Sequence, residues 1–173
     1  DLSVEAYTSL LWVFEGWTSY YDDLILLRAG LINEEQYRWL IGRMITRVYK
    51  GSGLNKQSLT DSSFTAWTKF YRQDENAPNS VVSYYAKGAM AAMALDLYLR
   101  RETNNTITLD DVLLTLWADY GAKGIGLQED TVEQVASQVS GLDLTEFFDQ
   151  VVRGTGKMGL DPLFAEVGVL ALN

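Results

Sequence analysis

Glu15 is the residue whose type and surroundings most clearly suggest chemistry. It lies within residues 11–21, LWVFEGWTSYY, where most neighbouring positions are apolar. A carboxylate removed from water without a partner costs several kcal/mol, so buried carboxylates are usually paired or bind a metal. On a helix, Glu15 would share a face with the residues three and four positions away. An exposed Glu15 on the wet side of a helix fits these residues equally well, because glutamate is most often exposed.

A second unusual stretch is SYYAKG, residues 83–88. Tyr84, Tyr85 and Lys87 would stand near the start of a helix. One interpretation is core packing of the tyrosines, with the stem of Lys87 along apolar surface and its ammonium in water. The other is that a tyrosine hydroxyl serves as a hydrogen-bond donor, while Gly88 allows another backbone to approach closely.

The composition excludes several kinds of chemistry. The chain has 173 residues, no His and no Cys. A histidine base, a Ser-His-Asp triad, a His-ligated metal site and thiolate chemistry within this chain are therefore excluded. The net charge is −9 and no block of Lys or Arg occurs, which argues against a nucleic-acid partner. Charged residues interrupt every apolar run well short of the ~20 residues that a membrane helix needs, so we expect no membrane span.

The apolar pattern predicts one all-α domain, a helical bundle. Long helices are expected over residues 4–27, 33–50 and 80–101, and no stretch alternates in polarity for long enough to build a sheet. Capping residues followed three positions later by an acidic or amide residue predict helix starts. These pairs are Asn33 with Gln36, Ser58 with Asp61, Thr108 with Asp111, Asp130 with Glu133, and Asp143 with Glu146. An extended tail is expected over residues 167–172.

Two short motifs link the two unusual stretches to a known family. The first is carried by Trp12, Glu15, Gly16, Thr18 and Tyr20, and the second by Tyr85, Lys87 and Gly88. In this order they resemble the motif pair of gluzincin aminopeptidases, which are zinc peptidases. Longer stretches resemble the glycyl aminopeptidase family, whose catalytic domain is thermolysin-like. These stretches cover residues 11–31, 63–72, 83–100 and 109–121.

The resemblance implies roles for four residues. Glu15 would be the third zinc ligand, and Tyr85 would be a catalytic residue that stabilises the transition state. Thr18 and Lys87 would have supporting roles, holding Glu15 or orienting Tyr85. In the family, two His ligands and a catalytic Glu come from an H-E-x-x-H helix. The implied activity is hydrolysis of peptides from the amino terminus, with a small first residue such as Gly or Ala.

The sequence departs from the family in one respect, because without His it cannot contain the H-E-x-x-H helix. The family places that helix shortly before the first motif and has an amino-terminal β-rich region, and many members carry a PDZ-like domain. We therefore expect residues 1–173 to be the carboxy-terminal helical lobe of a larger thermolysin-like catalytic domain. We expect zinc in the full-length parent, and neither zinc nor activity in this chain alone.

The expected partners are the peptide substrate and the missing amino-terminal half of the catalytic domain. Without that half, the apolar face around Trp12, Phe14, Trp17 and Tyr84 would lose its cover. Exposed apolar patches of this kind drive self-association.

Two other functions are compatible with the sequence. A non-catalytic helical interaction module that kept the lobe and lost the chemistry would be indicated by upstream sequence without H-E-x-x-H. An enzyme complete within this chain would use carboxylates as acid and base. Its candidates, Asp22, Asp23, Asp110 and Asp111, form adjacent pairs that do not face each other on a helix. Near a helix start such residues simply favour the helix dipole.

Overall fold

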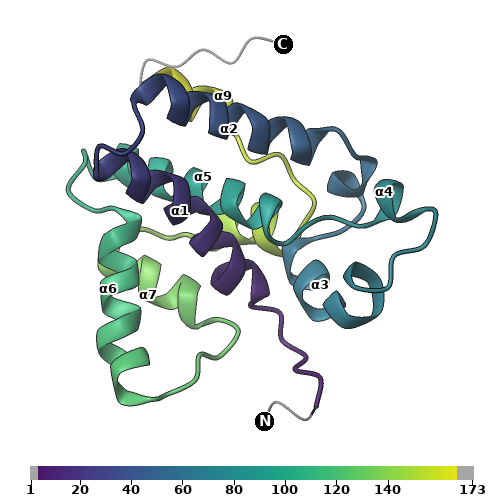
Figure 1. Cartoon of the computed structure of the whole chain (residues 1–173). Helices are drawn as coiled ribbons and strands as arrows, with labels where there is room; N and C mark the ends of the chain where they lie inside the picture. The colour runs from purple at the N-terminus through teal and green to yellow at the C-terminus, as the bar shows by residue number, and fades with distance from the viewer. Residues whose placement is uncertain (1–3, 167–173) are drawn as a thin grey trace.

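The computed structural model describes residues 4–166, apart from the side chain of Pro78. Within that range the chain is helical and has no strand, which confirms the all-α prediction (Figure 1). In chain order the elements are η1 (Trp12–Trp17), α1 (Thr18–Arg28), α2 (Glu34–Tyr49), η2 (Ser52–Asn55), α3 (Leu59–Phe64), η3 (Ala66–Phe70), α4 (Ala77–Ser80), α5 (Ala86–Glu102), α6 (Leu109–Asp119), η4 (Gly121–Lys123), α7 (Thr131–Ser140), α8 (Thr145–Phe147), η5 (Phe148–Arg153) and α9 (Leu160–Glu166). The elements η1, η3 and η5 are π-helical turns, and η2 and η4 are 3₁₀ turns. No helix in the described part is long and apolar enough to cross a membrane.

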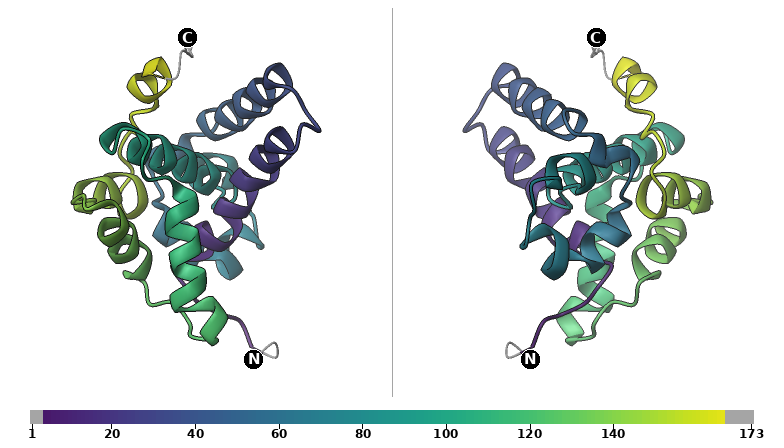
Figure 2. Two further views of the ribbon diagram at one scale, coloured as in Figure 1. Left: turned by 90° about the vertical axis from the view of Figure 1, so that its left-hand side faces the viewer. Right: turned by 90° about the vertical axis from the view of Figure 1, so that its right-hand side faces the viewer.

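Helix α5 lies at the centre of the fold. All residues from 86 to 96 are buried, and many of them are Ala or Gly. Such small side chains let neighbouring helices approach closely. The elements η1 and α1 cross one side of α5, while α2, α6 and α9 pack around the rest of it (Figures 1 and 2). The packing of the core therefore holds the side chains of η1 close to those at the start of α5.

The first long helix begins later than predicted. Residues 4–10 are not helical, and η1 starts at Trp12. The free N–H groups at this helix start find partners elsewhere, as the first turn of a helix requires. The Leu10 N–H donates to Thr8 Oγ1 at 3.1 Å, and the Trp12 N–H donates to Ser63 Oγ at 3.0 Å. The side chain of Ser63, distant in sequence, thus fixes where the helix begins.

The predicted helix over 80–101 was also too long at its start. A short helix α4 ends at Ser80, residues 81–83 are not helical, and α5 begins only at Ala86. The Val82 N–H donates to Gln57 Oε1 at 2.9 Å, and the Val82 carbonyl accepts from Ser62 Oγ at 2.7 Å. These contacts with the segment before and within α3 replace the helical hydrogen bonds.

Three of the predicted helix starts are confirmed with their caps. Asn33 and Gln36 form a reciprocal capping box, the Ser58 hydroxyl accepts the Asp61 N–H, and the Asp111 carboxylate accepts the Thr108 N–H. Asp130 is the N-cap of α7 as predicted, but its side chain makes no capping bond. The predicted cap at Asp143 was wrong, since the N-cap of α8 is Leu144, although the Asp143 carboxylate accepts the Thr145 N–H. The predicted extended tail, residues 167–172, lies outside the described residues.

A buried carboxylate fastens α1 to α5. Asp96 is 3% exposed and accepts hydrogen bonds from the Tyr20 hydroxyl and the Leu109 N–H, each at 2.8 Å. Arg100 Nε donates to the same carboxylate at 3.1 Å. Buried polar groups are stable when they are satisfied in this way. Asp96 therefore connects α1, α5 and the start of α6, and it fixes how α1 lies on α5.

Candidate active site

Glu15 lies in the π-helical turn η1, which continues directly into α1. The wide π turn changes which backbone N–H groups bond to which carbonyls, and side-chain hydroxyls from the next turn donate hydrogen bonds to two of these carbonyls. Thr18 Oγ1 donates to the Phe14 carbonyl at 2.8 Å and to the Glu15 carbonyl at 3.0 Å, and Ser19 Oγ donates to the Glu15 carbonyl at 2.7 Å. Thr18 thus holds the backbone of Glu15 and not its carboxylate. Single π turns within helices often occur at functional sites.

The glycines of the two motifs contact each other. A Cβ atom on Gly16 would lie 2.6 Å from the Cα and carbonyl carbon of Gly88. A Cβ atom on Gly88 would lie 2.8 Å from the Trp12 carbonyl oxygen and 3.0 Å from the Gly16 Cα. Only glycine at both positions allows η1 and α5 to cross at this distance. The contact brings together the residues next to each glycine, Glu15 on one side and the start of α5 on the other.

Tyr85 immediately precedes α5 and is partly buried. Its ring stacks on Tyr84 with the centroids 4.7 Å apart. Burial, the nearby hydroxyl of Tyr71 and the negative charge of Glu15 raise the pKa of Tyr85 to about 12. At neutral pH the phenol therefore keeps its proton and can donate it in a hydrogen bond. The charge of Glu15 is one of the causes of this raised pKa.

Lys87 is fully buried, so the interpretation that placed its ammonium in water was wrong. Its exposed fraction is 0%, and Nζ donates to the Gln57 carbonyl at 3.1 Å. Gln57 is also buried, and its side chain accepts the Val82 N–H. Lys87 and Gln57 together tie the first turn of α5 to the segment before α3. The contact of Lys87 thus supports the backbone on which Tyr85 stands.

Replacing Lys87 by methionine is expected to flatten the pH dependence of stability between about pH 8 and 10.5. Burial lowers the pKa of Lys87 from 10.5 to about 8. Within this window the unfolded chain binds a proton that the folded chain has released, so the free energy of unfolding rises with pH. Lys87→Met lacks that contribution. Urea unfolding across this pH range measures the slope.

The control for this experiment is Lys123→Met, which removes a half-exposed lysine paired with Asp119. This variant should keep the slope of the wild type. Identical slopes in the wild type and Lys87→Met would contradict the burial of a titrating ammonium at this position.

Two of the four carboxylates considered for an enzyme complete within this chain, Asp110 and Asp111, have structural contacts. Asp110 accepts from the Tyr21 hydroxyl at 2.7 Å and pairs with Arg28 at 2.8 Å. Burial opposes the charge of Asp110, but the hydrogen bonds from Tyr21 and Arg28 outweigh it and lower the pKa of this carboxyl. Asp111 accepts both the N–H and the hydroxyl of Thr108. These two carboxylates hold α1 and the start of α6.

The described residues offer no complete donor set for a metal. Between residues 4 and 166 no group of three or more acidic side chains lies close enough to hold a metal ion, and His and Cys are absent from the sequence. None of the ion pairs in this range involves Glu15. Catalytic zinc is bound by three protein ligands, among which a glutamate is common. The partly buried Glu15 fits one of these three positions.

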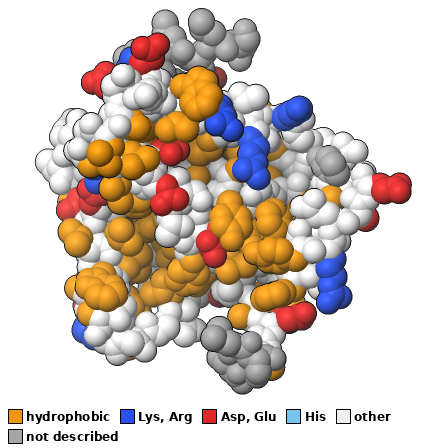
Figure 3. Space-filling view, in the orientation of Figure 1, with side chains coloured by type: hydrophobic (Ala, Val, Ile, Leu, Met, Phe, Trp, Pro, Cys, Tyr) orange, Lys and Arg blue, Asp and Glu red, His pale blue; other side chains and the backbone are white. Residues whose placement is uncertain are grey.

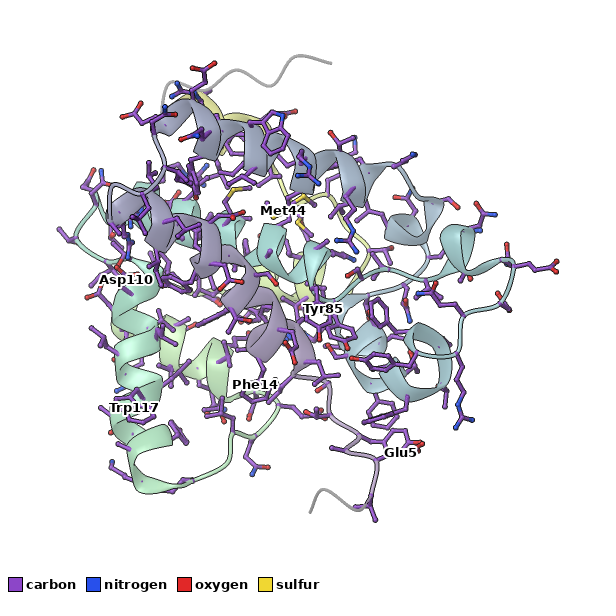
Figure 4. The ribbon with its side chains drawn as sticks, in the orientation of Figure 1. Glu5, Phe14, Met44, Tyr85, Asp110 and Trp117 are labelled. Carbon is purple, nitrogen blue, oxygen red and sulfur yellow. The ribbon has the colours of Figure 1, made fainter. Side chains whose placement is uncertain are left out.

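The apolar surface differs from the one predicted. Trp12, Trp17 and Tyr84 are buried within the chain, because η1 packs against α5 and the Trp12 ring lies 6.2 Å from that of Phe148. The prediction that these three would lose their cover was wrong. Phe14 alone of that set is exposed, at 49%. Figure 4 shows Phe14 on η1 and Trp117 on α6, and Figure 3 shows that apolar side chains are exposed on the same side of the molecule. We name this the Phe14–Trp117 face, which comprises Phe14, Leu113, Leu114 and Trp117.

Three residues that bind residues in or beside the two motifs were not singled out from the sequence. Gln57 and Asp96 are buried polar residues whose partners lie far away in the sequence. Tyr71 accepts a hydrogen bond from the Tyr84 hydroxyl at 3.0 Å. The only available signal was the general resemblance of residues 63–72, which include Tyr71 but mark no role for it.

Comparisons with known proteins show which family the chain resembles. Residues 1–91, which contain both motifs, match the family model described as M61 glycyl aminopeptidase. The crystal structure of an aminopeptidase N family protein from Idiomarina loihiensis superposes with a TM-score of 0.94 and 45% sequence identity. The match covers 98% of this chain and 29% of that chain, so this chain spans less than a third of the length of the solved relative. No match was found among curated protein sequences.

Proposed function

The chain belongs to the M61 glycyl aminopeptidase family, and on that premise we propose that it is the carboxy-terminal helical lobe of a zinc-dependent aminopeptidase. The observation that carries the proposal is the contact between Gly16 and Gly88. It brings Glu15, a carboxylate suited to zinc, within electrostatic range of Tyr85, a phenol that keeps its proton. Family membership supplies the reaction class, and this pair supplies two of the groups that the reaction uses.

Glu15 is proposed as one zinc ligand. The other two would be the histidines of an H-E-x-x-H helix outside this chain, because the chain contains no His and corresponds to 29% of its solved relative. When bound, zinc would supply an activated water and polarise the scissile carbonyl. Glu15 would present its carboxylate to the zinc ion from a fixed backbone, because the hydroxyls of Thr18 and Ser19 donate hydrogen bonds to the Glu15 carbonyl.

Tyr85 is proposed to donate its hydroxyl to the oxygen of the scissile carbonyl as negative charge develops there. A single donor of this kind contributes about 3–4 kcal/mol to transition-state stabilisation. The raised pKa of Tyr85 ensures that the proton is present at neutral pH. Lys87 contributes indirectly, because it anchors the helix start that carries Tyr85.

The remainder of the catalytic domain is proposed to cover the Phe14–Trp117 face. The face is apolar and exposed in this chain, and Phe14 lies next to Glu15. A segment that brings further ligands to Glu15 would therefore reach this surface too. In the chain alone the same face is free to self-associate, which sedimentation velocity measures.

A polypeptide extended upstream to include the proposed H-E-x-x-H helix tests this function. We expect zinc-dependent hydrolysis of peptides that begin with Gly or Ala, slower hydrolysis when the first residue is large, and loss of activity with a chelator. Acetylation of the substrate amino terminus is the control and should prevent cleavage. The 173-residue chain alone should be inactive. A zinc-loaded extended polypeptide that hydrolyses none of these peptides would contradict the proposal and favour a non-catalytic helical module.

A further inference from the structure

Three tyrosines from two parts of the chain meet beside the candidate site. Tyr71 follows η3, whereas Tyr84 and Tyr85 precede α5. The Tyr84 hydroxyl donates to the Tyr71 oxygen at 3.0 Å, and the rings of Tyr84 and Tyr85 stack at 4.7 Å. Tyr85 is labelled in Figure 4, where it lies between η1 and the part of the chain around α3. The three phenols form one connected group, which we name the tyrosine cluster.

Tyr71 occupies an unusual position within this cluster. Its side chain is exposed, at 56%, whereas Tyr84 is only 1% exposed. The Tyr71 ring packs edge-on against Phe70, with the centroids 5.4 Å apart, and lies 5.6 Å from the ring of Trp67. A buried phenol such as that of Tyr84 needs a hydrogen-bond partner. The oxygen of Tyr71 meets this need, so an exposed residue is held at a fixed position.

The hydrogen bond within the cluster has a direction. The Tyr84 hydroxyl donates to the oxygen of Tyr71, and the Tyr85 ring stacks on the Tyr84 ring. Tyr71 therefore fixes the Tyr84 hydroxyl, and it reaches Tyr85 through the stacked rings. The neighbouring phenol of Tyr71 is also among the causes that raise the pKa of Tyr85.

We propose that Tyr71 is a positioning residue whose oxygen holds the stacked Tyr84–Tyr85 pair and thereby sets the direction in which Tyr85 presents its hydroxyl to the substrate. The inference rests on the proposed function for its consequence in catalysis. Its structural part, the dependence of Tyr85 on the Tyr71 oxygen, concerns this chain alone. Removing that oxygen leaves the buried hydroxyl of Tyr84 without its acceptor and so loosens the pair in which Tyr85 stacks on Tyr84.

The first test uses the 173-residue chain with ¹³C-labelled tyrosine. Nuclear magnetic resonance follows the ring carbon of Tyr85, assigned with Tyr85→Phe, during titration with base. In Tyr71→Phe we expect the pKa of Tyr85 to fall below its wild-type value of about 12. The control Tyr49→Phe removes an exposed phenol from the end of α2 and should leave that pKa unchanged. An unchanged pKa in Tyr71→Phe would overturn the inference.

The second test uses the zinc-loaded extended polypeptide. Tyr71→Phe is expected to lower kcat about tenfold, the equivalent of one net hydrogen bond, with little change in KM. In the Tyr85→Phe background the same change should have no further effect, because residues that act through one another are not additive. Additive losses, or a rise in KM alone, would show that Tyr71 acts on the substrate directly and would overturn the positioning role.

The two tests separate the failure of the inference from the failure of the proposed function. If Tyr85→Phe has the kcat of the wild type, Tyr85 is not the donor and the proposed function loses that role, while the titration still decides whether Tyr71 holds Tyr85. If Tyr85→Phe lowers kcat but Tyr71→Phe does not, the proposed function stands and the inference about Tyr71 is wrong.

Discussion

Replacing Gly16 by alanine is expected to destabilise the chain by about 3 kcal/mol or more, at the upper end of what overpacking usually costs. The added Cβ atom would lie 2.6 Å from the backbone of Gly88, and a backbone atom in the core cannot turn aside as the end of a side chain can. The helices must therefore separate. Urea unfolding of Gly16→Ala and wild type measures the loss.

Gly42→Ala provides the matched control for this experiment. Gly42 lies inside α2, and a Cβ atom there would have no heavy atom within 4 Å. Since alanine favours a helix over glycine, this variant should be stabilised by up to about 1 kcal/mol. Gly16→Ala with the stability of Gly42→Ala would contradict the close contact of η1 and α5.

In the extended polypeptide, a shift of about 1 Å between Glu15 and Tyr85 should lower activity about 100-fold.

Tyr85→Phe is expected to lower kcat of the extended polypeptide by about 10²- to 10³-fold, the usual effect of removing one donor to a developing oxyanion. The ring and its stacking on Tyr84 remain, so the fold, the zinc content and KM should change little. Steady-state kinetics measure kcat and KM, and metal analysis on the same preparation measures the zinc content. Tyr49→Phe again serves as the control with an exposed phenol.

Two outcomes would contradict the role of Tyr85. Full kcat in Tyr85→Phe would remove the residue from the chemistry. A loss of kcat that parallels a loss of zinc would show that Tyr85 supports the metal site and does not act on the substrate.

The helical architecture could be predicted because it depends on local patterns. Asn33 and Gln36 cap α2 through atoms three residues apart, and such contacts can be recognised in the sequence. The starts of η1 and α5 could not be predicted in the same way. They depend on Ser63 and Gln57. The side chain of Ser63 accepts a hydrogen bond from a backbone N–H 51 residues away in the sequence, and that of Gln57 accepts one from a backbone N–H 25 residues away. Helical periodicity contains no information about such partners.

The candidate site was predictable only through the family motifs. Composition and spacing left the exposure of Glu15 open, and the π turn that carries it has no recognisable pattern in the sequence. The burial of Lys87 was not predictable either, because a lysine is buried only where the fold supplies an acceptor, here the Gln57 carbonyl. Gly88 was correctly associated with close approach of another backbone, but only the structure shows that this backbone is the one around Gly16.

The interpretation of the apolar face failed for a related reason. Trp12 and Trp17 were expected to be covered by a missing half of the domain, but η5 and α5 of this same chain bury them. A run of large apolar residues indicates that something covers them and does not indicate what. Phe14, next to Glu15 in the sequence, is not covered by this chain and stays exposed.

The most direct test of the central claim is zinc-edge anomalous diffraction from crystals of the extended polypeptide, with and without the substitution Glu15→Gln. We predict one zinc ion per chain with a Glu15 carboxylate oxygen at about 2.0–2.2 Å, and weakened or lost zinc in Glu15→Gln. A zinc ion bound away from Glu15, or zinc bound equally well in Glu15→Gln, would contradict the assignment of this carboxylate as a metal ligand.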